Sequence, residues 1–175
     1  MMNKRMPFVP LIVLLVVPSL STTAIAQPQE SLREASAAKT TTPHKADTIM
    51  SLSTAELGKI LKDPQTSDFA KAKACQRLAL IGDKSSVPEL TALLGNAKLA
   101  HYARFALEPI PDSSVDIALR GALEILQGPL LIGVINSIGR REDAEALKAL
   151  SQIIQGEDLA AADAARDALA RIRRP

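Results

Sequence analysis

A pattern of small and aliphatic residues, A-x-x-A-L-x-x-I, recurs along this chain and limits its fold more than any other feature. Residues spaced in this way lie on one face of an α-helix, so each copy predicts a helix with one apolar side. The last isoleucine of each copy follows the previous one after 29, 28 and 34 residues. Four copies are present, one with an arginine in place of alanine and one built from larger aliphatic residues: Ala103, Ala106, Leu107 and Ile110; Ala165, Ala168, Leu169 and Ile172; Ala74, Arg77, Leu78 and Ile81; and Leu131, Val134, Ile135 and Ile138.

The segment after each of the first three copies in chain order repeats as well. It begins with a short polar turn, at 82–85, 111–114 and 139–142, and continues with a second apolar stripe. Each copy therefore predicts two short helices joined by a tight turn, and a period of about 30 residues is typical of solenoids built from helix pairs. No window alternates long enough to predict a strand, so we expect an all-α domain of about three and a half helix pairs. The second stripes are Val87, Leu90 and Leu93; Val115, Leu119 and Leu123; and Ala144, Leu147 and Leu150.

Capping signals predict where individual helices begin and end. Ser53 and Glu56 have the spacing of a capping box, and the helix that they start ends at Lys62, before Pro64. Further boundary signals follow later in the chain: Ser86 with Pro88 and Glu89, Ser113 with Asp116, and Gly128 closing one helix with Pro129 opening the next.

These residues give the chain a resemblance to a known family. The run KACQRLALIGDKSSVPELTALL, Lys73 to Leu94, resembles the short HEAT-type repeats of bilin-lyase-like HEAT proteins in its small residues, its I-G-D turn and its V-P-x-L second helix. The resemblance covers about residues 68–175, and the helix predicted at 54–62 serves as an N-terminal cap. It implies an α-α superhelix, a right-handed stack of antiparallel helix pairs, with one concave layer that such proteins use mostly to bind other proteins.

Two details depart from the family pattern. Arg77 stands where the family prefers alanine, and the turn at 139–142 lacks the aspartate that Asp83 and Asp112 provide in the first two turns. A carboxylate at that place accepts hydrogen bonds from the backbone amides at the start of the following helix. These departures affect single repeats and leave the predicted architecture unchanged.

The N-terminal segment has the three parts of a secretory signal peptide. Lys4 and Arg5 provide positive charge, residues 11–17 form an apolar run between two prolines, and Ala24 and Ala26 provide the small-x-small cleavage pattern. We therefore expect cleavage after Ala26 and export of the mature chain to the periplasm or the extracellular space. The apolar run is shorter than the ~20 residues that a transmembrane helix needs, and a retained membrane anchor is the alternative.

The segment that follows the export signal is polar and lacks a sustained apolar period. Ser, Thr, Ala and Gln dominate it, and such a composition cannot bury enough apolar area to offset the entropy of ordering the chain. We therefore expect three parts: the signal peptide at 1–26, a disordered tether at 27–50 and a domain of HEAT-type helical repeats at 51–175.

Charge and aromatic content argue against nucleic acid as a partner. Of the 21 Lys and Arg residues, two precede residue 27, where no Asp or Glu occurs, so the mature chain carries 19 basic and 19 acidic side chains. Nucleic-acid binding relies on an excess of basic residues and on stacking rings. We expect a protein partner, no nucleic acid and no membrane contact beyond the export signal. The chain contains few aromatic residues: Phe8, Phe69, Tyr102 and Phe105.

The residues that usually carry catalysis or bind metals are scarce. His44 and His101 are the only histidines, and Cys75 is the only cysteine, which we expect to be buried on a helix and unreactive. The sequence contains no CxxCH, HExxH, GxSxG or P-loop motif. We therefore expect a non-enzymatic protein without metal or cofactor. The alternative is a small accessory enzyme or a tetrapyrrole-handling factor similar to bilin lyases, with its site at His101 and Tyr102.

Four side chains in the run HYARFALEPIPD lie outside the predicted core stripe: those of His101, Tyr102, Arg104 and Glu108. Two interpretations are open for them, a solvated or inter-repeat polar face and a patch that contacts a protein partner. The hypothesis for the whole chain is an exported HEAT-repeat protein that acts as an interaction module or scaffold, with these four residues as its candidate binding patch.

Two glycines stand within predicted helices, where glycine costs about 1 kcal/mol relative to alanine. These are Gly121 and Gly133, and we expect each to permit the close approach of a neighbouring helix. Asn136, in the same apolar helix as Gly133, is expected to lie at the surface.

Overall fold

Helices account for all the regular secondary structure between residues 46 and 174, the part of the chain that this computed structural model describes. The predicted all-α class is therefore confirmed for this part, while the expected signal peptide and residues 27–45 of the expected tether lie outside it. None of the helices in this part is long and apolar enough to cross a membrane. In chain order the elements are α2 (Ala46–Met50), α3 (Thr54–Lys62), α4 (Asp68–Ile81), the 3₁₀ turn η1 (Lys84–Ser86), α5 (Val87–Thr91), α6 (Ala100–Leu107), α7 (Ser113–Ile125), α8 (Gly128–Arg141), the 3₁₀ turn η2 (Ala144–Ala146), α9 (Leu147–Ile154) and α10 (Leu159–Ile172).

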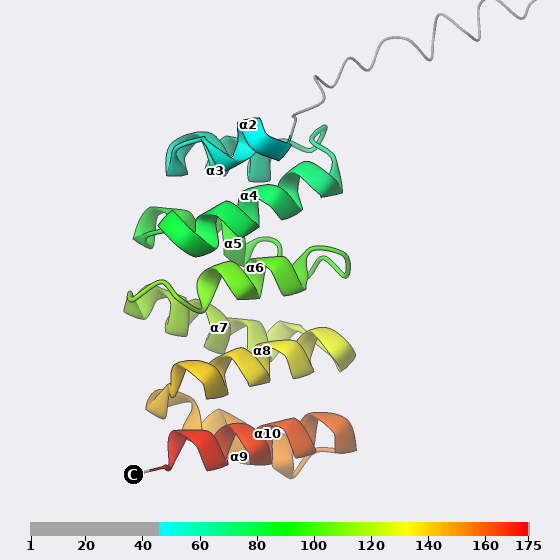
Figure 1. The fold of residues 1–175 in the computed structure, drawn as a ribbon. Coiled ribbons are helices and arrows are strands. Elements are labelled where there is room, and N and C mark those ends of the chain that lie inside the picture. The colour runs from blue at the N-terminus through cyan, green and yellow to red at the C-terminus, as the bar shows by residue number, and fades with distance from the viewer. Residues whose placement is uncertain (1–45, 175) are drawn as a thin grey trace, which may run out of the picture. The chain divides into compact units, whose positions relative to one another are not determined.

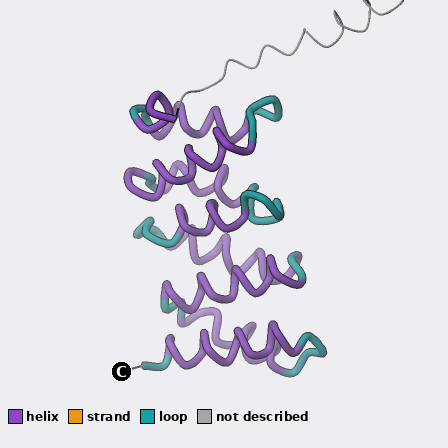
Figure 2. The backbone as a smooth tube through the Cα atoms, turned by 45° about the vertical axis from the view of Figure 1, so that its right-hand side comes forward, coloured by secondary structure: helices purple, strands orange, loops and turns teal. Residues whose placement is uncertain are grey.

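The helices are arranged in two layers (Figure 1). In the front layer α4, α6, α8 and α10 each pack against the next, and α5, α7 and α9 lie in the rear layer. The layers contact each other between helices that follow directly in the chain, such as α7 with α8 and α9 with α10. Both views show the helices following one another in chain order (Figure 2). Neighbours in sequence are thus also neighbours in space.

The predicted apolar stripes form the core between these layers. Ala103, Ala106, Leu107 and Ile110 are at most 1% exposed, as the repeated pattern predicts. The stripe on α8 is buried from Val134 onward, and the ends of other copies are only partly buried. Because many of the buried residues are alanines, the helix backbones can lie close together.

The helical unit begins earlier than the predicted start of the domain. α2 lies within the segment expected to be a tether, its Ile49 is fully buried, and the helix packs against α4. A helix of five residues spans too few positions to show an apolar period, so the sequence pattern does not reveal it.

Two predicted boundaries differ in outcome. The capping box at the start of α3 is confirmed: the Ser53 amide donates to the Glu56 carboxylate at 2.9 Å, and the Glu56 amide donates to Ser53 Oγ at 3.5 Å. Gly128 does not close α7, which already ends at Ile125. It is instead the first residue of α8, with φ of 54°, and Pro129 lies in the first turn of that helix as expected.

Aspartates cap the helical segment after each inter-helix turn. Asp83 and Asp112 each accept a hydrogen bond at 2.9 Å from the amide two residues further on, as predicted. The third turn also has such a residue, contrary to the prediction, because Asp143 accepts from the Glu145 amide at 3.1 Å. α8 continues to Arg141, so this turn begins later than the repeat spacing indicates.

Two serines predicted as N-caps do not have that role. Ser86 makes no capping hydrogen bond, and Ser113 is itself the first residue of α7. In both turns the preceding aspartate is the capping residue instead, because Asp83 accepts from the Ser85 amide and Asp112 accepts from the Ser114 amide.

The late third turn also shifts the second apolar stripe of that copy. Ala144, predicted to be in the core, is exposed, whereas Ala146 and Leu150 are fully buried. Counting from the capping aspartate restores the register, because Leu90, Leu119 and Leu150 each lie seven residues after one and are fully buried.

Gly139 is the glycine at which two helices meet backbone to backbone. A Cβ atom there would lie 2.9 Å from both Cα and Cβ of Ala168 on α10, which is closer than carbon atoms pack. Gly133, for which the sequence predicted this role, instead faces the Arg104 side chain, whose Cζ would lie 2.7 Å from such an atom. At Gly121 the prediction is wrong, since nothing lies within 4 Å of an added Cβ.

We expect the same substitution at two of these glycines to change stability in opposite directions. Gly139→Ala should lower the free energy of unfolding by about 1 kcal/mol, because overpacking costs more than the gain in helix propensity. Gly121→Ala should raise it by about 0.5–1 kcal/mol, since only the propensity changes. Urea denaturation followed by far-ultraviolet circular dichroism measures both, and a shift of the same sign in the two variants would contradict the assigned packing.

Acid should weaken the contribution that the first inter-helix turn, at 82–85, makes to the stability of the fold. Hydrogen bonds from the hydroxyl and the amide of Ser85 hold the pKa of Asp83 below its ordinary value of 3.8. A depressed pKa in the folded state stabilises the protein above about pH 4, and this contribution is lost as the pH falls through the folded-state pKa. Asp83→Asn keeps an acceptor without the titration, so it should be less stable than wild type at about pH 7, with a difference that shrinks toward about pH 2. A difference in unfolding free energy that stays constant over this range would refute the assignment.

Candidate functional site

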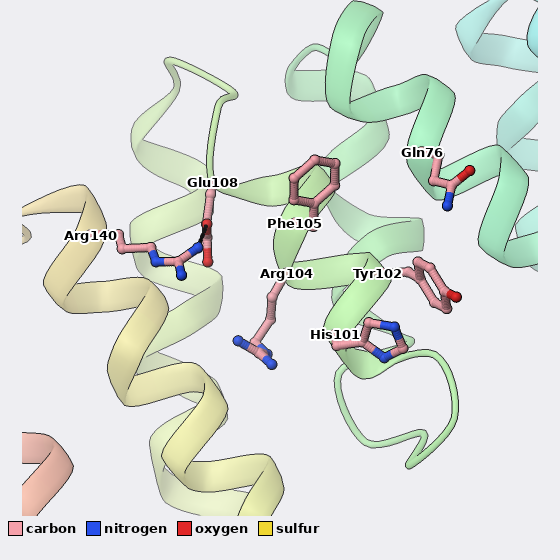
Figure 3. Close-up of a pocket in the computed structure, with 7 residues that line it drawn as sticks. All are labelled: Gln76, His101, Tyr102, Arg104, Phe105, Glu108 and Arg140. Atoms are coloured by element: carbon pink, nitrogen blue, oxygen red, sulfur yellow. Dashed lines mark hydrogen bonds and ion pairs between the residues drawn. The ribbon is translucent and has the colours of Figure 1, made fainter.

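The four residues predicted as a binding patch line one shallow pocket on the front layer (Figure 3). They lie on α6 and at its C-terminal end, and the pocket encloses about 380 Å³ between α4, α6 and α8. The structure thus brings all four together. The lining consists of Gln76, His101, Tyr102, Arg104, Phe105, Glu108 and Arg140.

His101 and Tyr102 form the aromatic end of this pocket. Their ring centroids are 3.8 Å apart with an angle of 39° between the ring planes. His101 is exposed and Tyr102 is half-buried. Together the two rings offer an accessible surface on which an apolar or planar group can pack.

Arg104 reaches across from α6 to α8. Its Nη1 donates to the carbonyl oxygen of Gly133 at 3.0 Å and lies 3.4 Å from Oγ of Ser137. The pKa of Arg104 lies below its ordinary value, mainly because the guanidinium is partly buried. The nearby Glu108 carboxylate offsets part of this decrease, and the positive charge of Arg140 adds to it. A guanidinium keeps its charge under such shifts, so Arg104 presents a positive charge that is held on the neighbouring helix.

Glu108 makes a second connection between the same two helices. Its carboxylate accepts a hydrogen bond from Oγ of Ser137 at 2.7 Å and one from Nη1 of Arg140 at 2.9 Å. Ser137 is fully buried, whereas Arg140 is exposed. Arg104 and Glu108 therefore join successive helices of the front layer and at the same time line the pocket.

Arg141 fixes the turn between α6 and α7 against α8. It binds both carboxylate oxygens of Asp116, at 2.5 and 2.9 Å, and this pairing raises the pKa of Arg141. Its guanidinium also donates to the carbonyl oxygens of Glu108, Ile110 and Asp112, at 2.9, 2.8 and 3.3 Å. The side chain is only 11% exposed. Arg141 thus holds the backbone from Glu108, at the end of α6, through the turn that follows it.

Two further pockets adjoin the first and share lining residues with it. One encloses about 420 Å³ beside Leu80, and the other encloses about 440 Å³ between α6, α8 and α10. Arg140 lines all three, so the pockets are continuous across the front layer. We call the surface that they form the front face: Gln76, Ala79, Leu80, His101, Tyr102, Arg104, Phe105, Glu108, Pro109, Pro129, Ile132, Gly133, Asn136, Arg140 and Arg171.

Sequence reasoning missed several residues of this face. Leu80 and Phe105 are large apolar side chains that are 72% and 57% exposed. Both lie on helices at positions between those of the core stripe, and an apolar residue at such a position is the signal that could have identified them. Asn136 is half-buried and lines the face, in partial agreement with the expected surface position.

A separate pocket lies in the rear layer between α7 and α9. It encloses about 540 Å³, is lined by Arg120, Glu124, Gln152 and their neighbours, and shares no lining residue with the front face. Arg120 is engaged in ion pairs with Asp143 and Glu145, at 2.6 and 2.7 Å. Because Arg120 is paired, the charge that this pocket presents is the negative charge of Glu124.

The lone thiol lies away from these surfaces. Cys75 is fully buried, as predicted, and burial raises its pKa to about 12, so the thiol is protonated at neutral pH. Among the residues from 46 to 174, no three His, Cys, Asp or Glu side chains are grouped so that they could hold a metal ion. The second histidine, His44, lies outside the described residues.

No protein-family model matches the chain, and no curated protein is significantly similar to it. The function must therefore be inferred from the repeated pattern and from the geometry of the front face.

Two adjacent arginines should differ in their importance for stability. Arg141→Lys loses the paired contact with Asp116 and most of the carbonyl contacts, and should lower the free energy of unfolding by about 2 kcal/mol. Arg140→Lys keeps the charge of an exposed pair and should change it by less than about 0.5 kcal/mol. Urea denaturation of both variants measures the difference, and equal effects would show that the Arg141 contacts do not hold the turn.

Proposed function

We propose that this protein is an exported HEAT-type α-α solenoid that binds another protein through the front face. The observation that carries the proposal is the continuity of that face: three adjoining pockets combine exposed apolar side chains with arginines across four helices. The proposed partner is a protein, and the proposed role is that of a non-enzymatic interaction module or scaffold.

The regular spacing of structural features supports a solenoid of helix pairs. The capping aspartates Asp83, Asp112 and Asp143 recur after 29 and 31 residues, and each is followed by a buried leucine at the same distance. Each helix of the front layer packs against the next one. In a solenoid built in this way, each repeat contacts only its neighbours, and an extended face remains free for binding.

The side chains of the front face are of the kinds that dominate protein interfaces. Exposed apolar residues such as Leu80 and Phe105 lose water-accessible area when a partner covers them, and the removal of apolar surface from water favours the complex. Aromatic residues and arginine are enriched among the residues that contribute most to binding. Tyr102, Phe105 and Arg104 lie beside one another on α6.

The rear layer is a weaker candidate. It exposes Ile117 and Ile125, but the pocket between α7 and α9 does not include either side chain. The front face is the stronger candidate because its three adjoining pockets combine exposed apolar side chains with arginines.

The tetrapyrrole alternative centres on His101 and Tyr102 and is tested separately. A stoichiometric change in the absorption spectrum of haem or of a bilin on mixing, abolished by His101→Ala, would overturn the scaffold proposal.

Export is tested by the N-terminal sequence of the protein from its native cells. A mature chain that begins at Gln27 supports export with cleavage, and an intact N-terminus supports the membrane-anchored alternative.

A site-specific crosslinking experiment tests the use of the front face. A photoreactive phenylalanine analogue replaces Phe105 in the full chain within its native cells, and a matched variant carries it at Ile125, a similarly exposed residue of the rear layer. We expect one discrete crosslinked protein from position 105 and none from position 125. Crosslinks of equal yield from both positions, or none from position 105, would contradict the proposal.

A further inference from the structure

Three arginines from three helices meet at one pocket of the front face. Arg104 of α6, Arg140 of α8 and Arg171 of α10 line the pocket of about 440 Å³, together with Asn136. No acidic residue is among its lining residues. We call this the arginine pocket.

The Glu108 carboxylate, which pairs with Arg140 and lies near Arg104, compensates one of the three positive charges of the arginine pocket. Among residues 46–174, neither Arg104 nor Arg171 has a carboxylate within ion-pair distance, and Arg140 uses only Nη1 for Glu108. Like charges placed close together repel each other, and a bound anion relieves this repulsion.

Arg104 also retains unused hydrogen-bond donors. A guanidinium has five N–H groups, and among residues 46–174 only Nη1 of Arg104 is engaged, with Gly133 and Ser137. Its Nε has no hydrogen-bond partner there either but is closed to solvent, so Nη2 is the donor that a ligand can reach. A carboxylate is well suited to this arrangement, because its two oxygens can accept charge-assisted hydrogen bonds from two different guanidinium groups.

An apolar pocket lies directly beside this charged one. Leu80, Phe105 and Pro109 line it, and Arg140 lines both pockets. A nucleic acid would meet the Glu108 carboxylate and an apolar surface at this place, whereas a peptide can present an acidic and an apolar side chain to the two pockets.

We infer that the front face binds an acidic segment of a protein partner, with a carboxylate side chain in the arginine pocket and an apolar side chain beside Leu80 and Phe105. This inference rests on the proposed function and adds the chemistry of the partner. It assigns Arg171 and Arg104 as the residues that distinguish acidic from neutral segments.

Selection from a displayed library of random peptides tests this directly, with the full chain as bait. We expect the selected peptides to contain Asp or Glu together with an apolar residue at a recurrent spacing. Synthetic versions of these peptides, and twins with Asn or Gln in place of the acids, are then compared by fluorescence polarisation. The twins should bind wild type at least about fivefold more weakly.

Matched variants locate the binding. Arg171→Ala should weaken the acidic peptides about fivefold or more and leave the neutral twins unchanged, whereas Arg173→Ala, an exposed arginine just beyond α10, should change both less than about twofold. Gly133→Ala should displace the Arg104 guanidinium and weaken the same peptides with little change in thermal stability, because the gain in helix propensity offsets the hydrogen bonds that Arg104 loses.

The outcomes separate the inference from the proposed function. Selected peptides without acidic residues, insensitivity to Arg171→Ala, or tighter binding of an oligonucleotide that competes for the same site would each overturn the inference. If no peptide is selected but the analogue at position 105 still crosslinks to a protein, the inference of an acidic segment is overturned and the proposed scaffold function stands. Failure of both experiments overturns both.

Discussion

The close approach of helices over alanine and glycine is the constraint on which the rest of the structure depends. Ala103, Ala106 and Ala168 are almost completely buried, and Gly139 meets Ala168 at backbone distance. A buried alanine removes little apolar area from water, so the free energy must come from many short contacts between well-fitted helices. This requirement explains why large aromatic residues are scarce and why Phe69 of α4 and Phe105 of α6 lie at the surface.

α8 connects this packing to the candidate binding surface. Its Gly133 and Ser137 hold the side chain of Arg104, and its Arg141 holds the turn after α6. The polar residues of the front face are therefore positioned by contacts between helices rather than by loops. Sites supported in this way keep their geometry better than sites carried by flexible segments.

Periodic features of this fold are predictable from the sequence, and features set by tertiary contacts are not. The stripe that ends at Ile110 was predicted residue by residue, because spacing alone determines which side of a helix is apolar. The predicted end of α8 was too early. Arg141, the last residue of this helix, contacts partners in and after the turn that follows α6, and no local sequence pattern indicates these contacts. The same limit applies to the site. His101 was recognised as lying outside the stripe, whereas the convergence of Arg171 with Arg104 depends on how α10 packs.

The absence of a side chain at Gly133 has a consequence for the energetics of recognition. The guanidinium of Arg104 occupies the space that a larger residue at position 133 would take, and it is already ordered on α8 before any partner arrives. Most long side chains lose about 0.5–1.5 kcal/mol of rotamer freedom when an interface immobilises them. For Arg104 this loss of rotamer freedom occurs during folding. A ligand therefore meets Arg104 as an ordered donor, whereas the exposed side chain of Arg171 must still be ordered on binding. A single missing methyl group can in this way divide the entropic cost of binding unequally between two neighbouring arginines.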